Sequence, residues 1–325
     1  MESTTKKPIT YTAFEKDVIS GLTDKPKHLS SKFIYDKNGD KIFQEIMAMP
    51  EYYLTNCEYN ILENQSAEIA EKFNLSEGFD LIELGAGDGK KTKLLLQHLV
   101  DINANFTYLP VDISQNVLDE LGAALSDKLP KVNFELLQGS YFQVLNQLSS
   151  YNKRQKIIFV LGSNIGNLMH KEAIDFLKKI EQNMAADDLL FMGFDQKKHP
   201  QVILEAYSDP HGITEKFNKN LLVRMNKEMD ANFDLDNFFH WESYNPETGT
   251  AKSFLVSRKA QQVKIKKLNL DIHFKDWETI HTEISQKYDD DTVEWLASEA
   301  NLGIDNVFES ESGFYKNYMF KKFKK

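Results

Sequence analysis

A glycine loop is the clearest candidate for chemistry in this sequence. The stretch "DLIELGAGDGKKT" (80–92) joins an apolar run ending in Glu83 to glycines at alternate positions, Gly85, Gly87 and Gly89, followed by lysines. Glycine permits a positive φ and a close approach of the backbone to a ligand. Such a loop between a strand and a helix predicts a site for a nucleotide or a related molecule.

The spacing of the loop discriminates between possible ligands. A phosphate-binding loop needs G-x-x-x-x-G-K-[ST], but Leu84 occupies the first glycine position and Lys91 follows Lys90. A dinucleotide loop needs G-x-G-x-x-G, whereas the third glycine comes one residue early. Glu83 would also repel a pyrophosphate. The pattern favours S-adenosylmethionine (SAM), whose ammonium an acid such as Glu83 can meet, and a dinucleotide is the alternative.

A second acid supports a nucleoside ligand. Asp112 ends the next apolar run, "YLPVDIS", where a carboxylate can accept both ribose hydroxyls. A dehydrogenase uses the same arrangement, so Asp112 alone fits both ligands.

The elements that must position these residues alternate along the middle of the chain. Strands are expected at 79–87, 106–114, 132–140, 156–164 and 188–196. Helices are expected between these strands, and Ser114 should cap the helix that follows the second strand. A further helix is expected before the first strand, over residues 56–73. This alternation predicts an α/β protein with a doubly wound, Rossmann-like, mostly parallel sheet covered on both faces.

The alternation stops after the fifth strand. Residues 197–286 are rich in polar turns and aromatics and predict antiparallel strands, followed by a helix at 290–301 and a hairpin at 306–322. We expect two domains: a core of 61–196 and 287–325, and an inserted α+β domain of 197–286 with 1–60.

Composition narrows the class of protein and its partners. The net charge is −10, which disfavours nucleic acid as a partner, and the basic end 321–325 is expected to be solvated. The N-terminus has no signal-peptide pattern and no stretch suits a membrane span. Cys57 is the only cysteine, so we expect a cytoplasmic protein without an intrachain disulfide. The histidines are scattered, so we expect no metal site. We also expect a monomer.

Several longer motifs resemble the histidine N-alpha-methyltransferase family of ergothioneine biosynthesis, nearly end to end. They are "YDKNGDKIFQEIMAMPEYYLT" (35–55), "ELGAGDGKKTKLLL" (83–96), "PVDIS" (110–114), "GSNIGNL" (162–168), "FNKNLLVRMN" (217–226), "LVSR" (255–258) and "TEISQKY" (282–288). The resemblance implies a SAM-dependent enzyme that methylates the α-amine of an amino acid, up to a trimethyl betaine. It also implies that the inserted domain binds the substrate.

The resemblance assigns aromatic residues to the substrate pocket. Tyr52 would contact the substrate ring and Tyr207 its carboxylate, while Tyr35 and Phe43 would shape the pocket. Tyr35 or Tyr52 would pass the amine proton to water. Without the resemblance, Tyr52 is a packed aromatic and Tyr207 a half-buried surface aromatic.

Three polar residues complete the implied substrate set. Asn167 would orient the amino acid group, with helix capping as its alternative. Glu283 and Ser285 would read the imidazole, because residues i and i+2 of an extended segment face the same side. Their alternative is the solvent face of a strand.

For the cofactor, the resemblance implies Gly85, Lys91 and Asp112. Lys91 would reach the SAM carboxylate as a point charge, or else be a surface lysine of the first helical turn. The family has Asp-Phe against the adenine, whereas this chain has Ser140-Tyr141. A hydroxyl accepts from the adenine amine without charge, so either weaker SAM binding or a different placement of this loop is expected.

Ser253 departs from the family at the imidazole wall, where the histidine enzymes have a methionine. The loss of that side chain enlarges or polarises the pocket. Histidine remains the expected substrate, to be trimethylated to hercynine by in-line transfer to the neutral amine. Another amino acid, such as an indolic one, and a SAM-binding protein without catalysis are the alternatives.

Overall fold

The computed structural model describes residues 10–149 and 154–323, and the chain forms two compact units. The first nine residues and the last two therefore lie outside the described part, as does part of the expected basic end. The sheet unit consists of Tyr53–Lys198 and Ser285–Lys325, and the second unit of Met1–Tyr52 and His199–Ile284.

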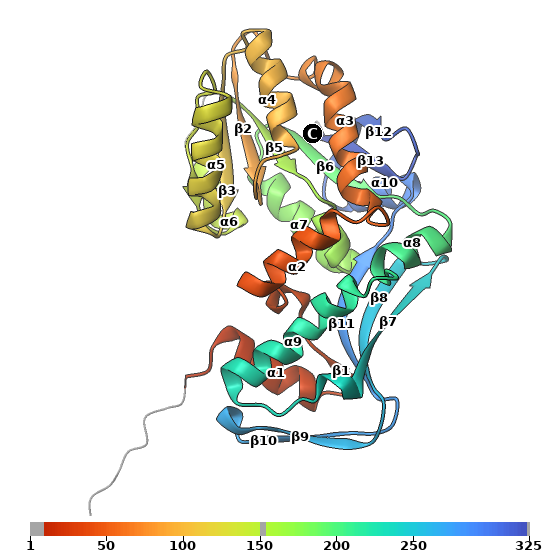
Figure 1. Ribbon diagram of the computed structural model, residues 1–325. Coiled ribbons are helices and arrows are strands. Elements are labelled where there is room, and N and C mark those ends of the chain that lie inside the picture. Colours follow the sequence, from red (N-terminus) through yellow and green to blue (C-terminus); the bar gives the residue numbers. More distant parts are fainter. Residues whose placement is uncertain (1–9, 150–153, 324–325) are drawn as a thin grey trace, which may run out of the picture. The chain divides into compact units, whose positions relative to one another are not determined.

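The sheet unit contains a seven-stranded sheet in the order β12-β13-β6-β5-β2-β3-β4 (Figure 1). Its strands are β2 (Phe79–Leu84), β3 (Phe106–Asp112), β4 (Leu137–Gln138), β5 (Gln155–Val160), β6 (Leu189–Asp195), β12 (Leu302–Glu309) and β13 (Tyr315–Lys322). The five strands β6, β5, β2, β3 and β4 pair in parallel with their neighbours. β13 is antiparallel to both β6 and β12. The strand order reverses between β2 and β5, the place where ligands bind in such sheets.

Helices cover both faces of this sheet (Figure 1). They are α3 (Tyr53–Ala70), α4 (Thr92–Asp101), α5 (Gln115–Lys128), α6 (Tyr141–Ser149), α7 (His170–Gln182) and α10 (Asp290–Glu299). Helices α6, α7 and α10 bury one continuous apolar core against the sheet. Strands β2 and β6 are buried at every residue, as expected of central parallel strands with both faces covered. The predicted doubly wound α/β fold is confirmed, and Ser114 caps α5 by accepting from the Val117 N–H.

The predicted third strand was too long. Within 132–140 only β4 and an isolated bridge between Tyr108 and Phe134 pair with β3. Because β4 is an edge strand with one neighbour, it can form backbone hydrogen bonds on one side only, which gives little stabilisation to a longer strand. The start of α3 at Tyr53 also means that the expected domain boundary after residue 60 falls within one continuous helix, which belongs to the sheet unit.

The second unit combines a four-stranded sheet, in the order β1-β11-β8-β7, with the pair β10-β9. Its strands are β1 (Lys27–His28), β7 (Phe238–Asn245), β8 (Thr250–Ser257), β9 (Gln261–Ile265), β10 (Leu270–Phe274) and β11 (Thr279–Gln286), and its helices are α1 (Ala13–Thr23), α2 (Lys37–Met47), α8 (Pro200–Tyr207) and α9 (Ile213–Met229). The predicted antiparallel pairing holds for β7 with β8 and for β9 with β10. Residues of α1, α9 and the strands share one apolar core.

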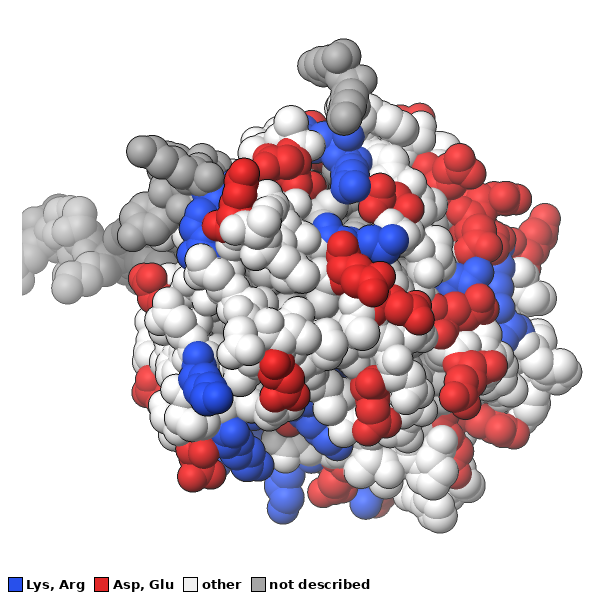
Figure 2. Space-filling view, turned by 90° about the horizontal axis from the view of Figure 1, so that it is seen from above, with Lys and Arg blue, Asp and Glu red and all other residues white. Residues whose placement is uncertain are grey.

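Charged side chains of both signs are interspersed on the face shown in Figure 2, and acidic ones are more numerous. Among the described residues, no helix has the length and apolar character needed to cross a membrane. The same residues contain no group of three or more His, Cys, Asp or Glu side chains suited to hold a metal ion.

Candidate active site

The glycine loop connects β2 to α4 in a left-handed conformation. Gly85, Gly87 and Gly89 have φ of 77°, 55° and 61°, values that side-chain-bearing residues rarely adopt. A Cβ on Gly87 would meet no atom within 4 Å, so open space adjoins the backbone there. A Cβ on Gly85 would collide with the hydroxyl of Tyr141. The loop therefore has room for a ligand beside Gly87 and packs against an expected adenine-binding residue at Gly85.

Asp112 lies beside this loop at the end of β3. Its carboxylate accepts from the backbone N–H of Gly87 at 3.3 Å and of Ser114 at 3.0 Å. Burial raises the pKa of the Tyr141 phenol, and the Asp112 charge adds to the rise, so the two side chains are neighbours. Ser140 is exposed and donates to Gln143 Oε1 at 2.9 Å. Open backbone, a carboxylate and an aromatic at adjacent strand ends fit a nucleoside with an amino acid tail.

Glu83 points into the protein interior. Thr92 Oγ1 donates to one of its oxygens at 2.7 Å and the hydroxyl of Tyr108 donates to the other. Burial raises the pKa of this carboxyl to about 7. The side chain therefore joins β2 to β3 and α4, and these contacts favour a structural role over the expected contact with the SAM ammonium.

Glu58 is a buried partner of Lys91 that the sequence alone did not predict. It is fully buried on α3 and accepts from Lys91 Nζ, the Gly162 N–H, the Tyr315 hydroxyl and Asn317 Nδ2. An acid within an ordinary amphipathic helix carries no local signal of this role. Glu58 orients Lys91 toward the carboxyl ends of β2 and β5, and Lys91 is paired rather than a freely solvated surface lysine.

The segments that carry Asn167 and Ser285 pack closely against each other. Asn167 ends the short 3-10 helix Asn164–Asn167 after β5, and its side chain is exposed. A Cβ on Gly166 would lie 3.0 Å from the carbonyl oxygen of Gln286, so the two segments touch. Met169 is the N-cap of α7, which removes the capping alternative for Asn167.

The second unit gathers the aromatic residues into one cluster. Ring centroids are 5.4 Å apart for Tyr35 and Phe43, 6.3 Å for Phe43 and Tyr52, and 6.2 Å for Tyr52 and Tyr207. Tyr207 is buried, against its surface alternative. Burial raises the pKa of Tyr35 well above its usual range, and the charges of Glu283, Tyr52 and Tyr207 add to the rise. Five expected substrate residues from three separate stretches of the chain therefore lie together.

Ser253 lies on the buried side of β8, and its hydroxyl donates to Glu242 Oε2 on β7 at 2.6 Å. The side chain at this position is thus polar and hydrogen-bonded to a carboxylate. Of the two expected consequences of losing the methionine, this contact favours a polarised wall over a simple enlargement.

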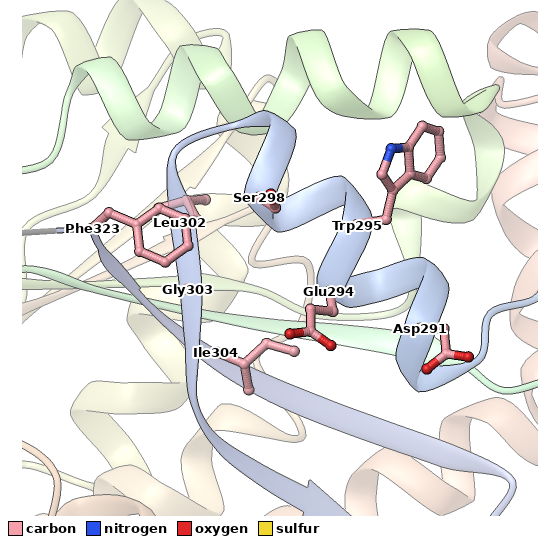
Figure 3. Close-up of a pocket in the computed structure, with 8 residues that line it drawn as sticks. All are labelled: Asp291, Glu294, Trp295, Ser298, Leu302, Gly303, Ile304 and Phe323. Carbon is pink, nitrogen blue, oxygen red and sulfur yellow. The ribbon is translucent and has the colours of Figure 1, made fainter.

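Cavities on the described part of the chain include one in each unit. One of about 520 Å³ is lined by α10 and β12, with Trp295 and Phe323 half exposed (Figure 3). Another, of about 530 Å³, lies in the second unit and is lined by residues that include Lys25, His28, Lys252 and His281. No residue expected in the site lines either cavity.

Comparison with known proteins gives a consistent result. A family model described as histidine-specific methyltransferase, SAM-dependent, matches residues 14–322. The chain is 34% identical over 291 residues to a histidine N-alpha-methyltransferase of Mycolicibacterium smegmatis, covering 89% of each chain. It is 28% identical to ergothioneine biosynthesis protein 1 of Schizosaccharomyces pombe, over 90% of this chain and 39% of that protein. It is 26% identical to a 4-dimethylallyltryptophan N-methyltransferase of Claviceps fusiformis, over 94% and 91%.

Proposed function

Because the chain belongs to the family of histidine-specific, SAM-dependent methyltransferases, we propose that it converts L-histidine to the Nα-trimethyl betaine, hercynine. The enzyme is an N-methyltransferase with SAM as its methyl donor. The observation that carries the choice of substrate is the cluster of Tyr35, Phe43, Tyr52 and Tyr207 with the carboxylate of Glu283 in electrostatic reach of Tyr35. In this proposal the second unit binds the amino acid and the sheet unit binds SAM.

We assign cofactor binding to the ends of β2, β3 and β4. Gly85 and Gly87 admit the amino acid part of SAM, Asp112 accepts from the ribose hydroxyls, and Ser140 and Tyr141 meet the adenine. Lys91, oriented by Glu58, binds the carboxylate. The sulfonium supplies an activated methyl group, and the chain's task is to hold the two reactants in line.

We assign substrate binding to the residues that the family resemblance implies. Tyr52 and Phe43 offer aromatic faces, which suit an amine that becomes a fixed cation as methyl groups accumulate. Tyr207 binds the carboxylate, Asn167 the amino group, and Glu283 with Ser285 the imidazole. Glu283 accepts hydrogen bonds only, so it matches a ring N–H.

The ammonium must lose a proton before each of the three transfers, because only a neutral amine has the lone pair that attacks the methyl group. Tyr35 has a raised pKa, so its phenol stays protonated at physiological pH and cannot act as a phenolate base. We propose that the Tyr35 or Tyr52 hydroxyl accepts the amine proton only while donating its own proton onward to water. This relay predicts a rate that rises with pH until the free substrate amine is neutral.

An indolic amino acid is the second candidate substrate. Ser253, bonded to Glu242, stands where the histidine enzymes have a methionine, and one relative is named for dimethylallyltryptophan. A wall that differs in polarity changes which ring is tolerated.

We further propose a monomer that acts in the cytoplasm without a nucleic-acid or membrane partner. The lone Cys57, which is buried, and the net charge of −10 support this environment.

The test is a product assay with purified protein, SAM and a mixture of the twenty amino acids, read by mass spectrometry. Histidine carrying three added methyl groups is the expected product. A methylated tryptophan in its place would favour the second candidate. No methylated product, with SAM binding intact by calorimetry, would overturn the proposed catalysis of free amino acids.

A further inference from the structure

A basic cavity lies against the four-stranded sheet of the second unit. Its volume is about 530 Å³. Its lining includes two lysines, two histidines and a threonine, namely Lys25, His28, Lys252, Thr279 and His281. All of its lining residues belong to the second unit, so the cavity is complete within that unit alone.

The alternation of the strands sets the side chains of the basic cavity on one face. On β11, Ile280 is buried in the apolar core, so Thr279 and His281 face the opposite side. β1 pairs in parallel with β11 and places His28 beside His281. Lys252 of β8 is half-buried between two buried neighbours and lines the same cavity. Three strands of one sheet thus bring two imidazoles and an ammonium together.

The basic cavity is opposite in charge to the protein as a whole, whose net charge is −10. Within residues 10–149 and 154–323, Asp24 is the one acid that lines it, and neither Lys25 nor Lys252 forms an ion pair. Burial lowers the pKa of His281, and the positive charges of Lys252 and His28 lower it further. Positive groups that face one another with too few counter-charges favour the binding of an anion.

One nitrogen of His281 also lacks a partner. Its Nε2 atom is buried and forms no hydrogen bond with the part of the chain that the structure describes. Buried polar atoms in native proteins are nearly always paired, so such an atom indicates a partner that the protein itself does not supply. A protonated imidazole donates from both of its nitrogens. An oxyanion beside the ring is therefore a suitable acceptor.

We propose that the basic cavity binds a small organic molecule through a phosphate-type dianion. Lys25 and Lys252 donate charge-assisted hydrogen bonds to its oxygens, and the Thr279 hydroxyl adds a neutral donor. The ring centroid of Phe254 lies 5.4 Å from that of His281, so this phenyl ring offers an apolar wall to the organic part. The cavity volume lies within the range of small-molecule pockets, roughly 300–1,000 Å³.

The test is a titration of the purified full chain with sodium sulfate, a tetrahedral dianion, at an ionic strength held constant with sodium chloride. Calorimetry should give a Kd of about 1 mM at about pH 6. Binding should be roughly fivefold weaker at about pH 8, where the imidazoles have lost their protons. In NMR spectra the imidazole C–H signals of His28 and His281, each identified by its substitution to Gln, should shift on binding. The signal of His98, which belongs to the sheet unit, should not.

Charge variants decide whether the cavity is the site. Lys252→Gln should weaken sulfate binding about tenfold, and so should Lys25→Gln, which changes an exposed residue and leaves the fold intact. Lys264→Gln, at an exposed lysine of β9 outside the cavity, is the matched control and should leave the Kd unchanged. Asp24→Asn should tighten binding about threefold, because it removes the acid.

Equal Kd values for the wild type, Lys252→Gln and Lys25→Gln would overturn the inference, as would equal weakening by Lys264→Gln. The absence of any shift at His28 and His281 would overturn it as well. Because the readout is anion binding and not methylation, these outcomes do not depend on the proposed function.

Discussion

The residues proposed to bind ligands fall into two halves, one in each unit, which are built in different ways. The half at the ends of β2 and β3 consists of backbone in left-handed conformations and a carboxylate that accepts backbone N–H groups. The half in the second unit consists of aromatic side chains from segments far apart in the chain. The first geometry follows from a strand-to-helix turn, whereas the second exists only once the second unit has folded.

The charged residues around the glycine loop are held by other residues of the protein. Around the glycine loop, Glu83 and Lys91 have protein partners, Thr92 and Tyr108 for the former and Glu58 for the latter. Protein partners thus hold charged side chains here before any ligand binds. Substitutions in the two halves should therefore separate effects on SAM from effects on the amino acid.

The largest effect is expected for Gly85→Ala. The φ of 77° is strained for alanine, and the added Cβ meets the Tyr141 hydroxyl. We expect a loss of SAM affinity of about a hundredfold and destabilisation by about 2 kcal/mol, measured by calorimetry and urea unfolding. Gly87→Ala is the matched variant, since it has strain without a clash. It should destabilise less, by about 1 kcal/mol. Unchanged SAM affinity in Gly85→Ala would contradict the loop assignment.

Asp112→Asn should raise the Kd for SAM about tenfold, because hydrogen bonds to a charged acceptor are about twice as strong as neutral ones. At saturating SAM the KM for histidine should be unchanged. Asp119→Asn, an exposed acid of α5, is the control. A change in histidine KM with SAM affinity intact would place Asp112 in the other half of the site.

Tyr52→Leu tests the aromatic half. Loss of the ring face should slow the third methylation most, by about fivefold, because that step forms the permanent cation. Dimethylhistidine should therefore accumulate in a mass-spectrometric time course, while SAM affinity stays at the wild-type value. Equal slowing of all three transfers would indicate a purely structural role for the ring.

The smallest effect on catalysis is expected for Glu83→Gln, which tests stability instead. Burial raises the folded-state pKa from 4.5 to about 7, so the folded protein keeps a proton that the unfolded chain loses. Stability should therefore fall as pH rises from about 4.5 to 7, by up to about 3 kcal/mol. Urea unfolding at about pH 5 and 8 should show this loss in the wild type and not in the variant. Parallel pH profiles for the two proteins would refute it.

Sequence patterns predicted the helices and strands of the sheet unit, but they did not predict the side-chain contacts between these elements. Alternating strands and helices, the glycine turn and the Ser114 cap are local signals, and the structure confirms them. The buried contacts of Glu58 and Lys287 include partners more than 90 residues away along the chain, Tyr315 for the former and Asp195 for the latter. No local pattern records such partners. The inward orientation of Glu83 was missed for the same reason, since it depends on Tyr108 of the neighbouring strand.

The pairing of β6 with β13 has a consequence for biosynthesis. β6 ends at Asp195 and its antiparallel neighbour begins at Tyr315, with residues 199–284 of the second unit encoded between them. While the ribosome makes that insert, the edge of a strand that is buried throughout in the folded protein has no permanent partner, and open edges of this kind template aggregation. The C-terminal hairpin is therefore the protective closure of the nascent sheet, and chains truncated before Tyr315 should be recovered as aggregates.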